Sequence, residues 1–134
     1  MGETAFALIA YAAWFIVLTL VMGFYRISVV LTGEKAVNTF AVDGSDHGPL
    51  GFRLTRARDN CYETLPAFAA IVLGAFIVGR FDITDPQAMW VLYARLAQSV
   101  MHIVSTSVVA VWVRATFFSV QMLIYLYWCI RLLG

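Results

Sequence analysis

Charged residues are scarce in this chain of 134 residues, making up 13% of it against about a quarter in soluble domains. Apolar residues make up 62%, which is more than a soluble fold of this size can bury. The net charge is only +1, so the sequence indicates neither nucleic-acid binding nor an acidic tail. The composition therefore predicts an integral membrane protein.

Cysteine and histidine are also rare, and the few that occur are dispersed. Cys61 and Cys129 lie in apolar segments without CxxC spacing, so we expect reduced packing residues rather than a disulfide. His47 and His102 are far apart in the sequence, and no Gly-rich phosphate loop or Ser-His-Asp arrangement can be assembled. The sequence therefore predicts no metal site.

Four stretches are long and apolar enough to cross about 30 Å of hydrocarbon as helices. We expect spans at about 4–30, 53–80, 86–111 and 114–132, with a polar loop over about 32–51. Asp85 and Pro86 mark the start of the third span. The predicted fold is an all-α membrane protein, a four-transmembrane-helix bundle in one domain over residues 1–134.

Basic residues gather at one end of the predicted bundle. They are Arg26, Lys35, Arg53, Arg56, Arg58 and Arg114, against Arg80 and Arg131 at the other end. The positive-inside rule then places the loop in the cytoplasm and both termini outside. Glu3 precedes the first apolar run in place of a basic segment, so we expect that run to stay as a span rather than be cleaved. We expect a multi-pass protein of a bacterial inner membrane.

Several polar residues fall inside the predicted spans and need an explanation. Arg56, Asn60 and Glu63 have the i, i+4, i+7 spacing of one helix face. Glu63 and Arg95 lie at similar depth in antiparallel spans, each about 15 Å from its span's start, so we expect them to pair inside the bundle. Such a pair can fix helix register or support a site, and the sequence leaves both readings open.

Three arginines of different spans, Arg26, Arg56 and Arg114, lie near the loop end. Arginine binds carboxylates bidentately and stays charged, so together they would form a basic pocket for an anionic, water-soluble ligand. The alternative is that they are interface anchors that reach lipid phosphates. His102 lies seven residues after Arg95 on the same helix face and fits either a packing role or a site.

These residues carry a resemblance to a known family. The segment from Arg56 to Pro66, RARDNCYETLP, resembles the RxxxNxxExxP signature of the MAPEG family, the membrane-associated proteins in eicosanoid and glutathione metabolism. The segment YARLAQSVMH, from Tyr93 to His102, is similar to the third-span arginine segment of that family. GFYR, which ends at Arg26, is similar to the end of its first span. The family includes microsomal glutathione transferases, leukotriene C4 synthase and prostaglandin E synthase.

The resemblance implies a homotrimer that binds glutathione, as a co-substrate, between neighbouring subunits near the cytoplasmic face. Its partners would be copies of itself and lipids or a lipophilic substrate, with no nucleic acid. By motif position, Arg114 matches the arginine that stabilises the glutathione thiolate, the catalytic role. The positions that would contact glutathione or support its site are Arg26, Arg56, Asn60, Glu63, Arg95 and His102.

Three positions depart from the family's pattern. His102 stands where catalytic members usually carry a tyrosine, and Ala115 and Phe118 stand where the prostaglandin synthase has a serine and a tyrosine. We therefore expect a glutathione transferase or peroxidase acting on hydrophobic electrophiles, rather than eicosanoid-type chemistry. The alternatives are a non-catalytic member that binds lipid or acts as a scaffold, and an unrelated helical subunit or transporter whose polar cluster is structural.

Overall fold

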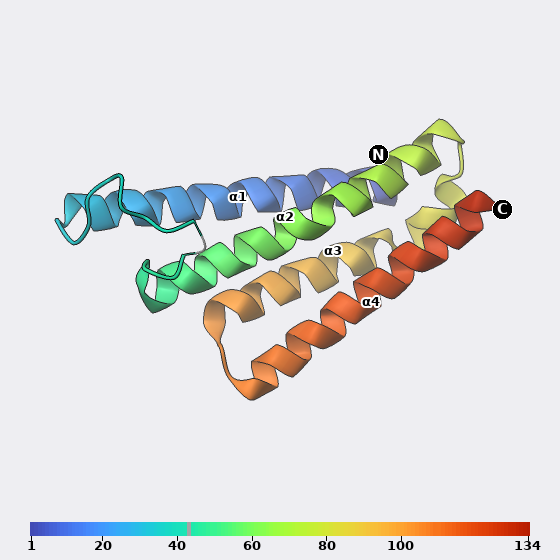
Figure 1. The fold of residues 1–134 in the computed structure, drawn as a ribbon. Helices are drawn as coiled ribbons and strands as arrows, with labels where there is room; N and C mark the ends of the chain where they lie inside the picture. Colours follow the sequence, from blue (N-terminus) through green and yellow to red (C-terminus); the bar gives the residue numbers. More distant parts are fainter. Residues whose placement is uncertain (43) are drawn as a thin grey trace.

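The computed structural model is a bundle of four helices that alternate in direction, with both termini at one end (Figure 1). It describes residues 1–42 and 44–134. The α1–α2 loop and the α3–α4 turn lie at the other end, which we call the loop end. The helices are α1 (Glu3–Leu31), α2 (Gly48–Ile77), α3 (Phe81–Val104) and α4 (Val108–Leu133). The predicted all-α fold is confirmed.

Helices α1, α2 and α4 are each long and apolar enough to cross a membrane. Helix α3 is more polar, but it packs against all three of the others and buries its polar side chains among them. Since α2 and α4 run in the same direction, the chain between them has to return across the same thickness. Helix α3 thus turns its buried polar groups, among them Arg95, Gln98 and His102, towards the other helices.

The start of α3 differs from the predicted position, because the helix begins at Phe81 rather than at Pro86. The carboxylate of Asp85 accepts hydrogen bonds from the backbone amide of Thr4 (2.9 Å) and from its hydroxyl. These bonds tie the first turns of α3 to the start of α1. They offset the intrahelical hydrogen bond that Pro86 removes in the second turn, so the helix continues through the proline.

The end of α3 also differs, because the helix stops at Val104 and not near residue 111. Ser105 has an extended backbone conformation, with φ −150° and ψ 148°. Two residues later the Ser107 hydroxyl accepts a hydrogen bond from the Ala110 amide at 3.2 Å and caps the start of α4. A serine N-cap satisfies one of the free amides of a helix start, which explains why the chain breaks here.

Removing this cap should destabilise the protein modestly. We expect Ser107→Ala to lower the free energy of unfolding by about 1 kcal/mol, measured by thermal unfolding in detergent. The matched control is Ser119→Ala on the exposed face of α4, where the hydroxyl bonds only the Ala115 carbonyl of its own helix. That control should change stability by less than about 0.5 kcal/mol. Equal losses for the two variants would contradict the capping role.

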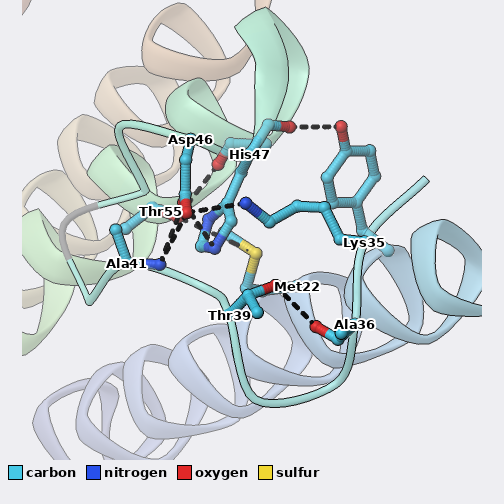
Figure 2. Close-up of polar contacts among 10 residues, drawn as sticks. Met22, Lys35, Ala36, Thr39, Ala41, Asp46, His47 and Thr55 are labelled. Atoms are coloured by element: carbon cyan, nitrogen blue, oxygen red, sulfur yellow. Dashed lines mark hydrogen bonds and ion pairs between the residues drawn. The ribbon is translucent and has the colours of Figure 1, made fainter.

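The loop between α1 and α2 is held by its own side chains and by α2. Figure 2 shows the Asp46 carboxylate between Lys35, whose ammonium lies 2.8 Å away, and the Ala41 amide, 2.9 Å away. The hydrogen bond from Lys35 keeps the pKa of Asp46 below its usual range. Gly44, with φ +76°, passes so close to α2 that a Cβ would lie 2.6 Å from the Thr55 hydroxyl. The loop therefore has a defined course over the end of the bundle.

Aromatic rings fill the half of the core nearest the termini. The Phe68 ring of α2 lies 5.7 Å from Tyr125 and 6.2 Å from Trp128 of α4, and 5.2 Å from Tyr11 of α1, between ring centroids. All four side chains are buried. Ring pairs at these distances add to the gain from burial, so this layer joins α1 and α4 to α2.

Candidate functional site

A cavity of about 250 Å³ lies at the loop end, where α2, α3 and α4 meet. Three of its lining residues are arginines and none is acidic, so positive potential is concentrated in a small space. The cavity is lined by Phe52, Arg53, Arg56, His102, Thr106 and Arg114. The structure thus brings together three of the residues predicted from the sequence, one from each of three helices.

Arg53 is a member of this cavity that the sequence analysis did not select. It lies three residues before Arg56 in the first turns of α2, so both side chains share one helix face. Its Nε donates to the Ile103 carbonyl at 2.7 Å, which satisfies one of the last carbonyls of α3. Its i, i+3 spacing to Arg56 is the sequence feature that could have identified Arg53 as a residue of the same site. Arg53 joins the start of α2 to the end of α3 beside the cavity.

Arg114 is held in the cavity by His102. Its Nη1 lies 2.8 Å from Nδ1 of the imidazole. A guanidinium stays protonated, so it must donate this bond and Nδ1 must accept it. His102 is therefore neutral, with its proton on Nε2. The contact fixes the direction of the Arg114 guanidinium and leaves its other N–H groups for a ligand.

Deeper in the bundle, Arg95 is completely buried. Its Nη1 donates to the Asn60 side-chain oxygen, and its Nη2 donates to the Thr64 hydroxyl at 2.8 Å. Its Cζ lies 5.4 Å from the centroid of the Tyr11 ring. The guanidinium thus contacts side chains of α1 and α2 from α3, and spreads its charge over two oxygens and a ring. This arrangement makes it a polar cross-link in the middle of the bundle.

The model of the MAPEG family matches residues 4–134, which is nearly the whole chain. The chain belongs to the MAPEG family. No curated protein and no solved structure matches it. MAPEG membership confirms the resemblance seen in the sequence, and it indicates a membrane protein with a function related to glutathione or eicosanoid metabolism.

Within the MAPEG signature, Glu63 does not take the place expected from the sequence. Its side chain is exposed, and among the described residues no hydrogen bond or ion pair joins it to Arg95. The prediction of a Glu63–Arg95 pair inside the bundle is wrong. The buried face of α2 passes through Cys61, Thr64 and Phe68, so Thr64 faces Arg95 while Glu63 lies about 100° around the helix.

Arg26, the first-span arginine of the MAPEG motif, is also separate from the cavity. Its Cζ lies 5.7 Å from the centroid of the Phe40 ring in the loop. It does not line the cavity that holds Arg56 and Arg114, so within one chain the three arginines do not share a pocket. The reason is the packing order, because α1 packs against α2 and α3 whereas α4 packs against the other side of that pair. Arg53 supplies the third arginine instead.

Ala115 and Phe118, the two α4 positions that depart from the pattern of the MAPEG prostaglandin synthase, are exposed and do not line the cavity. Of the α4 side chains, Arg114 is the one that lines the cavity among the described residues. The polar groups that face the cavity come from the arginines, His102 and Thr106.

Proposed function

We propose that this MAPEG member is a glutathione transferase that joins glutathione to hydrophobic electrophiles from the bilayer, with peroxidase activity on lipid hydroperoxides. The observation that carries the proposal is the acid-free cavity with three arginines, in which Arg114 is fixed by neutral His102. Glutathione has two carboxylates, one amine and one thiol, so it carries net negative charge. Arg53 and Arg56 suit its carboxylates, and Arg114 suits its sulfur.

The chemistry follows from the charge of Arg114. A free thiol has a pKa near 8.5, and only the thiolate is nucleophilic. A guanidinium next to the sulfur stabilises the thiolate, so the thiol loses its proton to water at neutral pH. The sulfur then attacks an electrophilic carbon; the new S–C bond forms as the leaving group departs with its electron pair. Arg114 is the residue to which we assign the catalytic role.

The site of one chain is small for this substrate, which supports closure of the site by a neighbouring copy; the family resemblance implies that the assembly is a homotrimer. Its volume of about 250 Å³ is below the range of about 300–1,000 Å³ typical of small-molecule sites. Glu63 is exposed about ten residues along α2 from Arg53, where a carboxylate facing lipid would be costly. A neighbouring copy that covers Glu63 and closes the cavity resolves both problems. Glutathione would then bind between subunits, with Asn60 and Arg95 supporting the site from below.

The charge distribution supports an orientation for this site. Most basic residues lie at the loop end, so we place the loop end and the cavity in the cytoplasm of a bacterial cell, with both termini outside its inner membrane. Glutathione then reaches the cavity from the cytoplasm, and the electrophile reaches it laterally from the lipid.

The proposal is tested with the purified protein in detergent, by calorimetry with glutathione and by turnover of glutathione with a chromogenic aryl chloride. We expect saturable binding and conjugation. Binding without turnover over a broad panel of electrophiles and hydroperoxides would favour a second candidate, a non-catalytic glutathione- or lipid-binding member. The exposed apolar residues Ala115 and Phe118 are what favours that candidate. Absence of glutathione binding would refute the transferase and leave only a lipid-binding or structural role.

A further inference from the structure

Three polar atoms in the contact between α3 and α4 are buried without a hydrogen-bond partner among the described residues. They are Nε of Arg95, the side-chain oxygen Oε1 of Gln121 and the hydroxyl of Tyr125. Arg95 and Gln121 are completely buried, and Tyr125 is 5% exposed. None of the three lines the loop-end cavity, so an inference about them stands independently of the proposed function. A buried polar group without a partner is costly, and each such group in a folded protein needs an explanation.

The three residues lie at one level of the bundle. The Gln121 amide donates to the Gln98 side-chain oxygen at 2.9 Å, which marks the register between the antiparallel helices α3 and α4 (Figure 1). From that pair, Arg95 lies one turn along α3 and Tyr125 lies one turn along α4, both towards the termini. The charge of Arg95 also acts on the Tyr125 hydroxyl, which requires the two groups to be close. The three atoms therefore belong to one polar layer.

The free oxygen of Gln121 cannot be satisfied by turning its amide around. Its Nε2 donates to two acceptors, the Gln98 oxygen and the Phe117 carbonyl at 3.0 Å. The opposite orientation would place Oε1 against that carbonyl, so that two acceptors would face each other. Oε1 is therefore an acceptor that still requires a donor.

Arg95 requires a further partner because of its charge. Among the described residues, no carboxylate forms an ion pair with it. Its two terminal nitrogens donate to Asn60 and Thr64, which leaves Nε as the donor without an acceptor. A buried guanidinium without an acid beside it is stabilised by the dipoles around it, so an acceptor at Nε would lower the cost of burying this charge.

We propose that Arg95, Gln121 and Tyr125 form a binding site for an internal water molecule. The water accepts the Nε–H of Arg95, donates to Oε1 of Gln121 and shares a third hydrogen bond with the Tyr125 hydroxyl. Three hydrogen bonds are typical of a buried water, and here they satisfy all three atoms. An anion cannot donate to Oε1, and a cation is repelled by the guanidinium. The site therefore takes a small neutral molecule that both donates and accepts.

The test is X-ray radiolytic footprinting of the full-length, unaltered protein in detergent, read by mass spectrometry. Hydroxyl radicals form from bound water as well as from bulk water, so a buried tyrosine beside a bound water is oxidised in place. The internal control is Met22, which is 1% exposed and carries an easily oxidised sulfur. We expect Tyr125 to be oxidised faster than Met22 by about fivefold or more. Protection of Tyr125 equal to that of Met22 would overturn the proposal.

The source of the oxygen separates bound water from bulk water. Brief mixing with water that carries a heavy oxygen isotope should label the oxidation products of Tyr127, which is 41% exposed, before those of Tyr125. Simultaneous labelling of the two tyrosines would show that bulk water reaches Tyr125 freely, and it would overturn the bound-water site.

The sign of a stability change gives an independent measurement. Tyr125→Phe removes the hydroxyl and keeps the ring, so it should lower the melting temperature by about 4 °C if that hydroxyl bonds a water. Removing an unpaired hydroxyl would instead leave the melting temperature unaltered or raise it, and either result contradicts the proposal. The matched control is Tyr93→Phe, where the side chain is 57% exposed and no change is expected. A lower melting temperature combined with a protected Tyr125 would also overturn the proposal, because the hydroxyl would then bond a protein group directly.

Discussion

Replacing Arg114 by alanine should lower kcat/KM for glutathione conjugation by about a hundredfold to a thousandfold. A hydrogen-bond donor held in place beside a negative charge typically raises the rate by this factor. His102 holds Arg114 in this way, with 2.8 Å between the two nitrogens. Without the guanidinium, the pKa of the bound thiol should return towards about 8.5, so the pH profile of kcat/KM should move to higher pH. Glutathione affinity should fall much less, because Arg53 and Arg56 remain. Steady-state kinetics and the ultraviolet absorbance of the bound thiolate measure these changes.

The matched control is Arg131→Ala, on the same helix but exposed at the opposite end of the bundle. It removes the same charge and should leave kinetics unaltered. Arg114→Lys should recover part of the rate, since it returns a cation but not the planar fork. His102→Leu should lower kcat without a comparable rise in KM, because it loses the group that orients the arginine. A pH profile that Arg114→Ala does not move would show that another residue stabilises the thiolate.

Replacing Arg95 by alanine should lower the free energy of unfolding by about 3 kcal/mol, the largest stability effect we expect. The change leaves a cavity in a completely buried position and removes the donors to Asn60 and Thr64. Thr64 keeps its bond with the Tyr11 hydroxyl, so the Asn60 oxygen bears most of the loss. Relief of the buried charge acts in the other direction, but the two oxygens and the Tyr11 ring already compensate much of its cost. Unfolding by a denaturing detergent measures the change.

Arg95→Met separates packing from polar contacts, because methionine fills much of the volume and donates no hydrogen bond. We expect it to cost about half as much as Arg95→Ala. Arg131→Ala again serves as the exposed control, with a change below about 0.5 kcal/mol. If Arg95→Ala is as stable as the unaltered protein, the cost of burying the guanidinium equals the value of its contacts. Arg95 would then have to be retained for the site rather than for the fold.

The membrane class, the helix count and the family could be predicted from the sequence because each depends on local or additive properties. An apolar run of sufficient length becomes a helix in a bilayer whatever its neighbours are, since no other structure satisfies its backbone there. The order of residues between Arg56 and Pro66 suggested the family without any knowledge of contacts, and the match of the family model to residues 4–134 confirms it. The ends of α3 were harder to predict from the sequence, because its start depends on Thr4 of α1 and its end on the Ser107 cap.

Helical spacing placed the right residue types at the right depth but left the rotation of each helix undetermined. The i, i+4, i+7 pattern fits Glu63 as well as the i, i+8 pattern fits Thr64, and both start from Arg56. The choice between them was made by the buried residues Cys61 and Phe68, which turn Thr64 towards α3. Neighbouring residues of a helix point about 100° apart, so an error of one position assigns the buried contact to the wrong residue.

By itself, the sequence determined that this is a helical membrane protein of the MAPEG family with an excess of arginine at one end. Only the tertiary structure decided how those arginines are divided: Arg53, Arg56 and Arg114 share one cavity, while Arg26 lies alone in another. The physical reason is that charge and hydropathy add up along the chain, whereas the sharing of a cavity depends on which helices are neighbours. Because α1 and α4 lie on opposite sides of the α2–α3 pair, their arginines cannot meet within one chain.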